Sequence, residues 1–454
     1  MKWLQLTTSY SKSIPNPPLN EVSILIAGTK CSEGGLNLPL DYQRIAPLAY
    51  LTTTISNAIT LRTIYSTDTQ KPKHILLSLI DELLRTPNDP AEILLSNISP
   101  EKRDLILALT TFTRINKLPP NTTLENLTDL NEISQSMGST ALSKYNSLKI
   151  LELLTTDLDK AQFVSQSSPG AACVFMTPPT DKPFYLSSEE FSTLINTRIF
   201  GTSPDPIGYP TPNQYPTLSA KALTFDCPFC NFKNGSLTYQ HILVCPGGGG
   251  NIKRHNECIY LFQQLLTIAG IPHTIREPKI INTSTRKRVD IITSHINAQR
   301  GYDLAIVSPN VPTYCHRASR EQFYAAQSKY NEKITKHQPA YTAENADFVP
   351  LILESTGAIH PRTLSEIGAL ISLAGQTPHP THHAFNIQYN YQFWTHTISI
   401  AAVRATINKQ IIARSKAHNL VQQLLMPPEG TANLPTSHAP HTTFMQTLRP
   451  SFSE

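Results

Sequence analysis

The amino-acid sequence predicts an α/β protein: a helical N-terminal region, a cysteine-rich knuckle, and then a core in the order α-β-β-β-α-β. Three observations lead to this class. Apolar residues recur at intervals of three and four before residue 165, three cysteines and a histidine stand between residues 227 and 245, and short β-branched runs alternate with helical patterns after residue 250. Strands that alternate with helices are typical of a layered α/β domain rather than of a helical bundle.

The N-terminal region, residues 1–165, is expected to be mostly helical. Residues 141–156 (ALSKYNSLKILELLTT) show its apolar spacing clearly. The shorter run 21–28 (EVSILIAG) is continuous rather than periodic, and we interpret it as strand-like.

A loop-rich linker, residues 166–226, follows because prolines interrupt it repeatedly. One helix is expected inside it, where Ser187 or Ser188 can cap the first turn with Glu190 following. At the other end of the chain, residues 426–454 are rich in Pro, Thr and His and are predicted to be disordered.

Composition limits the class of protein. A chain of 454 residues has room for two or three domains, and with 40% hydrophobic and 16% charged residues it is expected to be globular. No window reaches the roughly 18 consecutive apolar residues of a membrane span, and the seven cysteines are too few for a disulfide scaffold. We therefore expect an intracellular protein without a membrane partner. A nuclear location is a further expectation, and composition does not test it.

The net charge of +5 is unevenly distributed. Residues 227–345 hold 14 Lys and Arg against 7 Asp and Glu, a balance of +7, so the rest of the chain sums to −2. Such a basic segment suits a partner with a phosphate backbone. A solvated basic face explains the same charge equally well.

The cysteine cluster has the spacing of a zinc knuckle. Cys227, Cys230, His241 and Cys245 form the pattern C-x2-C-x10-H-x3-C. Three thiolates and one imidazole complete a tetrahedral site with no open position, so we expect structural Zn²⁺. Cys258 is an alternative ligand, although it falls on the apolar face of the next helix. The four glycines after Cys245 lack the Gly-Lys-Ser/Thr of a phosphate-binding loop and are interpreted as a joint.

The elements after the knuckle are expected in a regular order. Each predicted strand is short, β-branched and bounded by turn residues, whereas each helix shows three-and-four spacing. The expected order is a helix at 254–270, strands at 273–281, 288–294 and 302–309, a helix at 318–344, a strand at 347–356 and a helix at 362–375.

Acidic residues on these strands form a candidate metal site. Asp290 and Asp303 are separated by twelve residues, and they meet at one end of the sheet if their strands are antiparallel neighbours. With Glu277 they make an oxygen-rich pocket suited to Mg²⁺. A metal held there can activate water and stabilise charge on a phosphate oxygen. Taken singly, each acid also fits an ordinary strand end or turn.

Several stretches together resemble a known family. The segment HILVCPGGGG runs into KRHN, and EP, RVD, DLAIVSP and DFVPLILESTG follow in order. This is similar to the carboxy-terminal part of the polyprotein of site-specific non-LTR retrotransposons, in which a zinc knuckle precedes a restriction-enzyme-like endonuclease of the PD-(D/E)XK superfamily. The stretches SPGAACVFMTPPTDKPFYLSSEEF and EGGLNLPLDYQRIAPLAYLTT also resemble segments of that polyprotein. The resemblance spans residues 33–375 and is strongest over 166–357.

The resemblance implies a knuckle at 227–250 and a restriction-endonuclease-like domain at 251–425. It implies a Mg²⁺-dependent DNA endonuclease that nicks its target and leaves a 3′-hydroxyl for target-primed reverse transcription. Catalytic Mg²⁺ would be held by Glu277, Asp290 and Asp303. We further expect nucleic-acid contacts from a basic set that surrounds the site, namely Lys253, Arg254, His255, Arg286, Lys287 and Arg288. For the Arg-His-Asn segment, a buried brace or a helix cap stays open as the alternative.

The sequence departs from the family at two points. Val289 replaces the proline of the Pro-Asp dipeptide, and Ala305 replaces the lysine expected two residues after Asp303. In related elements that lysine has moved to the next helix, and KITKH supplies Lys333 and Lys336 as its counterparts. Lys329 is a further candidate.

The expected partners are a DNA target, element RNA, and a reverse transcriptase that is supplied on another chain or lost, because this chain has no Tyr-x-Asp-Asp sequence. Two other hypotheses remain. A decayed element would leave a zinc-dependent nucleic-acid-binding remnant without catalysis, and a zinc-stapled protein-interaction module would neither bind nor cut DNA.

Overall fold

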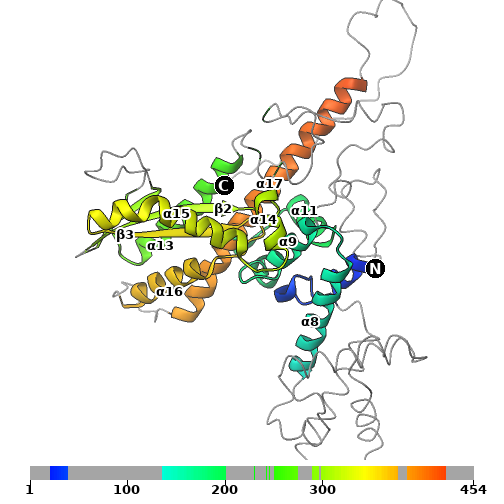
Figure 1. Ribbon diagram of the computed structural model, residues 1–454, viewed down its shortest axis with the longest axis horizontal. Helices are drawn as coiled ribbons and strands as arrows, with labels where there is room; N and C mark the ends of the chain where they lie inside the picture. Colours follow the sequence, from blue (N-terminus) through cyan, green and yellow to red (C-terminus); the bar gives the residue numbers. More distant parts are fainter. Residues whose placement is uncertain are drawn as a thin grey trace, which may run out of the picture.

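The computed structural model describes residues 21–38, 135–200, 250–274, 289–295, 298–376 and 386–425, together with Cys230, Ile242 and Cys245. Over these residues the protein is a mixed α/β structure, mostly helical, with a small three-stranded sheet (Figure 1). In this part of the chain no helix has both the length and the apolar character needed to cross a membrane.

The sheet has the order β1-β2-β3, with β1 at Ile291–His295, β2 at Ala298–Val307 and β3 at Asp347–Glu354. Strands β1 and β2 form an antiparallel pair, whereas β2 and β3 run parallel. The crossover between the parallel strands contains helices α14 (Pro312–Ala318) and α15 (Tyr324–Ala343). This matches the predicted order of strand, strand, helix and strand. The long helix predicted at 318–344 begins at Tyr324 instead.

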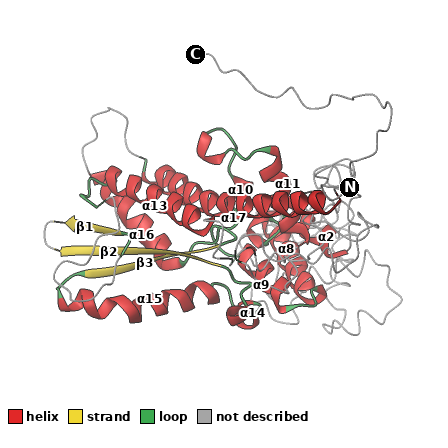
Figure 2. Ribbon diagram, turned by 90° about the horizontal axis from the view of Figure 1, so that it is seen from above, coloured by secondary structure: helices red, strands yellow, loops and turns green. Residues whose placement is uncertain are grey.

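Two helical layers cover the sheet, as Figure 2 shows. Helix α15 lies along one face, and the other face is covered by α13 (Gly250–Ile268), α16 (Pro361–Gln376) and α17 (Ile387–Leu425). Alternate residues of β3 point to opposite faces of the sheet. Leu351 and Leu353 pack in the core under α13, α16 and α17, whereas Ile352 packs toward α15. Because both faces are buried, the strand is continuously apolar.

The predicted first strand of the core is only partly described. His273 forms an isolated antiparallel bridge with Thr293 of β1, and the hydroxyl of Thr274 accepts the Ile292 amide hydrogen at 2.9 Å. The backbone after the α13 turn therefore runs along the outer edge of β1. Residues 275–281 of this predicted strand lie outside the described residues.

The N-terminal helices are α2 (Glu21–Gly28), α8 (Gln135–Leu153), α9 (Asp157–Gln166), the short α10 (Cys173–Met176) and α11 (Ser188–Phe200). The strand-like interpretation of 21–28 was wrong, because this run forms α2 and packs its apolar residues against α8, α9 and α11. The predicted cap of α11 is confirmed. Ser187 Oγ accepts from the Glu190 amide at 3.2 Å, and Glu190 Oε2 accepts from the Ser187 amide at 2.8 Å.

A buried arginine joins three parts of this N-terminal assembly. The Arg198 side chain, 2% exposed, donates to the carbonyls of Cys31, Gly35 and Ala171. Burial lowers the pKa of Arg198 to about 10, and the neighbouring Cys31 opposes that shift. The three carbonyls satisfy a guanidinium that would otherwise be costly to bury.

Candidate functional site

The two predicted strand carboxylates lie side by side at one end of the sheet. In the β1–β2 register Ile291 pairs with Tyr302, and the Asp290 amide donates to the Tyr302 carbonyl at 3.0 Å. Continuing that antiparallel register by one residue sets Asp290 opposite Asp303. The charge of Asp290 helps to raise the pKa of Asp303, so the strands bring two of the three predicted acids close enough to interact.

Helix α15 places a lysine against the second carboxylate. Lys333 Nζ lies 2.6 Å from Asp303 Oδ2, and both side chains are nearly buried, at 13% and 12% exposure. One turn further along α15, His337 Nε2 lies 3.4 Å from the same oxygen. Lys336 is exposed on the outer side of the helix, and Lys329 pairs with Glu332 at 2.6 Å. Of the three candidate lysines, Lys333 is thus the one that reaches Asp303.

Helix α13 approaches the first carboxylate from the other face of the sheet. His255 Nε2 lies 3.1 Å from Asp290 Oδ2. The same oxygen accepts the Leu304 amide hydrogen at 2.6 Å. Asp290 is therefore held between the strand next to it and a histidine on the covering helix.

Crowding of these charges moves their pKa values in opposite directions. Burial raises the pKa of Asp303, and the adjacent Asp290 charge adds to this against the opposing effect of Lys333. Burial also favours the neutral form of Asp290, but the hydrogen bonds from His255 and Leu304, together with the charges of His255 and Lys333, outweigh it and lower the pKa of Asp290. The result is an ionised Asp290 beside a more readily protonated Asp303, which is the usual outcome for two carboxyl groups in one site.

The pKa of His255, which lies beside Asp290, is raised, whereas that of Asp290 is lowered. Burial disfavours the charged imidazole of His255, but the hydrogen bonds to Asp290 and Asn256 and the charges of Asp290 and Asp303 together outweigh it and raise the pKa of His255. The partner on the other ring nitrogen is Asn256, whose Oδ1 lies 3.4 Å from Nδ1.

The predicted Arg-His-Asn segment divides between the interior and the site. Arg254 is 6% exposed and donates to Thr406 Oγ1 at 3.2 Å and Asn251 Oδ1 at 3.4 Å. Its guanidinium is enclosed between α13 and α17, so the predicted nucleic-acid contact of Arg254 is replaced by a buried brace. Of its two neighbours, His255 contacts Asp290 and Asn256 is exposed beside the His255 ring.

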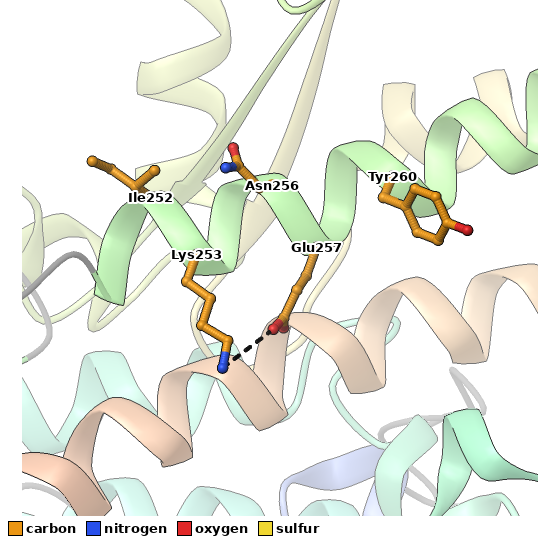
Figure 3. Close-up of a pocket in the computed structure, with 5 residues that line it drawn as sticks. All are labelled: Ile252, Lys253, Asn256, Glu257 and Tyr260. Carbon is orange, nitrogen blue, oxygen red and sulfur yellow. Dashed lines mark ion pairs between the residues drawn. The ribbon is translucent and has the colours of Figure 1, made fainter. Parts of the chain in front are cut away.

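The outer face of α13 is open to solvent. A pocket of about 590 Å³ lies on this face. Figure 3 shows the side chains that line it, namely Ile252, Lys253, Asn256, Glu257 and Tyr260. Lys253 and Glu257 extend from the same side of the helix, with Nζ and Oε1 3.9 Å apart. Lys253 thus remains available as the predicted phosphate contact, although Glu257 partly offsets its charge.

The predicted knuckle is only partly described. Cys245 is fully buried and Cys230 is half-buried. The Cys245 carbonyl accepts hydrogen bonds from Lys409 Nζ of α17 at 2.8 Å and from Asn251 Nδ2 at 3.0 Å. The last predicted zinc ligand is therefore anchored to the core by two helices.

Several predicted site residues lie outside the described part of the chain: Cys227 and His241 of the knuckle, Glu277 of the acidic set, and the basic residues Arg286, Lys287 and Arg288. Among the described residues, no three His, Cys, Asp or Glu side chains stand together as a metal-ligand cluster. The described donor set is the pair Asp290 and Asp303. This pair fits Mg²⁺, which proteins often bind through one or two carboxylates together with water and substrate phosphate.

A further acid, Glu354 at the end of β3, is fully enclosed. Ser165 of α9 donates to Glu354 Oε2, and the Ala326 amide donates to Oε1 at 3.3 Å. Burial raises the pKa of Glu354 to about 7. Glu354 joins α9 to the sheet, which agrees with the core-bracing role that its place on a buried strand suggests.

The contact of His337 with Asp303 is not apparent from a motif. The signal available was its spacing, because residues four apart on a helix share a face, and Lys333 and His337 are four apart. A scan against models of known protein families and a search of the curated proteins found no match to this chain.

Proposed function

We propose that this protein is a Mg²⁺-dependent DNA endonuclease with a restriction-endonuclease-like core and a structural zinc knuckle. The observation that carries the proposal is the contact of Lys333 with Asp303, 2.6 Å apart, beside Asp290. The family resemblance requires two carboxylates and a lysine, and it allows the lysine to come from the helix after the second acid. Here the acids are Asp290 and Asp303, and the lysine is Lys333, 30 residues after Asp303.

The residues suggest a division of roles. Asp290 and Asp303 would hold the metal, which when bound supplies a Lewis acid for the phosphate oxygen and lowers the pKa of water. Lys333 would orient the attacking water through its ammonium group, and the proton of that water would pass to solvent. Water oxygen then bonds to phosphorus as the phosphorus–O3′ bond breaks, and the departing oxygen gains a proton. The products are a 3′-hydroxyl and a 5′-phosphate, and the 3′-hydroxyl is the end that could prime DNA synthesis.

A second candidate function is a nucleic-acid-binding protein without catalysis. It is favoured by the ion pairing of Lys333 and His337 with Asp303, which also stabilises the sheet end without a metal. In that case the basic segment would bind DNA, and the acidic cluster would be structural.

Plasmid nicking distinguishes the two functions. Purified protein with Mg²⁺ or Mn²⁺ should convert supercoiled plasmid to the nicked form, and Asp290→Asn should lower the rate by at least about 100-fold because it removes a metal ligand. DNA binding measured without divalent metal should be equal for both proteins and should weaken with salt. Salt-sensitive binding with no nicking by either protein would support the non-catalytic function, and the absence of both would contradict both proposals.

A further inference from the structure

Two histidines contact the two carboxylates of the site from opposite faces of the sheet. His255 comes from α13 and His337 from α15, and Figure 2 shows these helices on the two sides of the strands. Neither residue belongs to the set that the nuclease chemistry needs, since metal binding and water activation are assigned to Asp290, Asp303 and Lys333. Their position therefore calls for a separate explanation.

The contacts share one feature: each reaches the Oδ2 atom of its carboxylate. Asp290 Oδ2 receives His255 Nε2 at 3.1 Å and the Leu304 amide at 2.6 Å. Asp303 Oδ2 receives Lys333 Nζ at 2.6 Å and His337 Nε2 at 3.4 Å. Two nitrogens close to one oxygen restrict the rotation of the carboxylate plane about its last side-chain bond.

The surroundings of the histidines keep their rings in place. His337 is 2% exposed and stacks on Phe348 of β3 with ring centroids 5.0 Å apart. His255 lies on the second turn of α13, which buried Arg254 attaches to α17. Because each ring is fixed by its own helix, it can hold a carboxylate in one orientation.

The contact of His337 with Asp303 also explains how Lys333 could leave Asp303 to assist a water. An ammonium that binds Asp303 at 2.6 Å is engaged with the carboxylate, but assisting a water requires it to turn toward the substrate. His337 places a second nitrogen, Nε2, 3.4 Å from the same oxygen. The carboxylate can then keep its orientation when Lys333 moves.

We propose that His255 and His337 are positioning residues that fix Asp290 and Asp303 through Oδ2, so that the two carboxylates offer their Oδ1 atoms to one divalent cation. This inference rests on the proposed endonuclease function. It assigns His255 a role through Asp290 instead of the phosphate contact that its place in the Arg-His-Asn segment predicts.

The test compares His255→Leu with His255→Gln in the full-length protein. Leucine removes the hydrogen-bond donor, whereas the glutamine amide retains one at similar reach. We expect His255→Leu to weaken Mn²⁺ binding by about 10-fold or more, the usual cost of losing a partner of a metal ligand, and His255→Gln to restore most of it. Mn²⁺ binding is followed by the loss of the free-ion electron paramagnetic resonance signal, without DNA.

A second pair tests the buried histidine. His337→Phe keeps a ring to stack on Phe348 but removes the nitrogen that faces Asp303, and His337→Gln keeps a donor. Thermal unfolding identifies any variant that has lost its fold. The expected result is a folded His337→Phe protein with weakened Mn²⁺ binding and a raised Mg²⁺ concentration for half-maximal nicking.

The outcomes separate this inference from the function on which it rests. If wild-type protein nicks DNA but His255→Leu and folded His337→Phe bind Mn²⁺ as wild type does, the positioning roles are wrong and the endonuclease stands. If His255→Leu instead weakens metal-free DNA binding with unchanged Mn²⁺ affinity, His255 is a phosphate contact. If wild type neither nicks DNA nor binds Mn²⁺, the proposed function fails as well.

Discussion

The position of one lysine decides the chemistry proposed for this site. Lys333 and Lys336 are three residues apart on α15, yet only Lys333 of these two is on the buried side toward Asp303. In the sequence both fit the expected motif equally. The sheet distinguishes them, because residues 333 and 337 share the helix face that packs on β2 and β3.

This difference predicts opposite results for two matched variants. Lys333→Met should lower the nicking rate by at least about 100-fold, in line with the loss of a group that orients the attacking water, while DNA binding without metal changes little. Lys336→Met should keep a rate within about twofold of wild type. Single-turnover nicking at saturating protein measures both, and the reverse ranking would reassign the lysine.

Glu354 joins α9 to the sheet, but its burial costs stability when the carboxyl group is ionised. Its pKa of about 7 lies above the ordinary 4.5 because burial disfavours the charged form. The folded state therefore binds the proton more tightly than the unfolded state does. Stability associated with this group is present below pH 4.5, falls between pH 4.5 and 7, and is lost above that range.

Glu354→Gln removes this titration and should flatten the pH dependence. Glutamine can still accept from the Ala326 amide and can donate to Ser165. The free energy of unfolding of the variant minus that of wild type should increase by roughly 3 kcal/mol between pH 4.5 and pH 8. Urea unfolding at the two pH values measures the change, and identical slopes of stability against pH for both proteins would show that folding does not raise the pKa of Glu354.

At the scale of elements, the site depends on how closely α15 lies on β2. Gly301, next to Tyr302 on β2, faces the ring of Tyr341, and a Cβ atom at this position would overlap the ring. The absence of a side chain lets the helix lie close to the strand. That closeness allows Lys333 and His337, from one to two turns earlier on α15, to reach Asp303.

Gly301→Ala should therefore destabilise the protein by about 1–3 kcal/mol, as expected for overpacking, and should weaken nicking because α15 moves. Gly368→Ala is the matched control within a helix. Its added Cβ would lie 3.5 Å from Tyr391, an ordinary contact, so helix propensity should make it stabilising by about 0.5–1 kcal/mol. Thermal unfolding of both variants checks the prediction, and equal effects would indicate that α15 tolerates displacement.

The elements also show where sequence patterns succeed and fail. The α11 cap was predictable because Ser187 and Glu190 interact locally. The α2 run was misread as strand because a short, uniformly apolar segment has no distinguishing period. The break between α14 and α15 depends on Phe323, whose φ of 61° is rare for a non-glycine residue and has no sequence signal.

For the whole molecule, the N-terminal helices and the sheet are joined by buried polar contacts. Glu354 bonds to Ser165 of α9, and the Ile359 amide donates to the Pro169 carbonyl at 3.0 Å. Figure 1 shows the N-terminal helices beside one end of the sheet layers. Such long-range contacts join residues nearly 200 positions apart, so periodicity could not predict them.

The candidate site was predictable to a similar extent. The strand pattern was enough to predict that Asp290 and Asp303 would meet, because an antiparallel pair fixes the register of both acids. Which lysine serves them, and that His255 and His337 contact them, depends on how two helices pack on opposite faces. Arg254 was assigned to nucleic acid from its motif, but packing against Thr406 of α17 buries it.

We propose that Asp290 and Asp303 form one divalent-metal site. The most direct measurement is anomalous X-ray scattering from crystals of the protein soaked in Mn²⁺, which takes Mg²⁺ positions. We expect a peak about 2.1 Å from one oxygen of each carboxylate, and we expect this peak to be lost in Asp290→Asn. A protein crystallised with Mn²⁺ that shows no peak there, or a peak bound to neither acid, would contradict it.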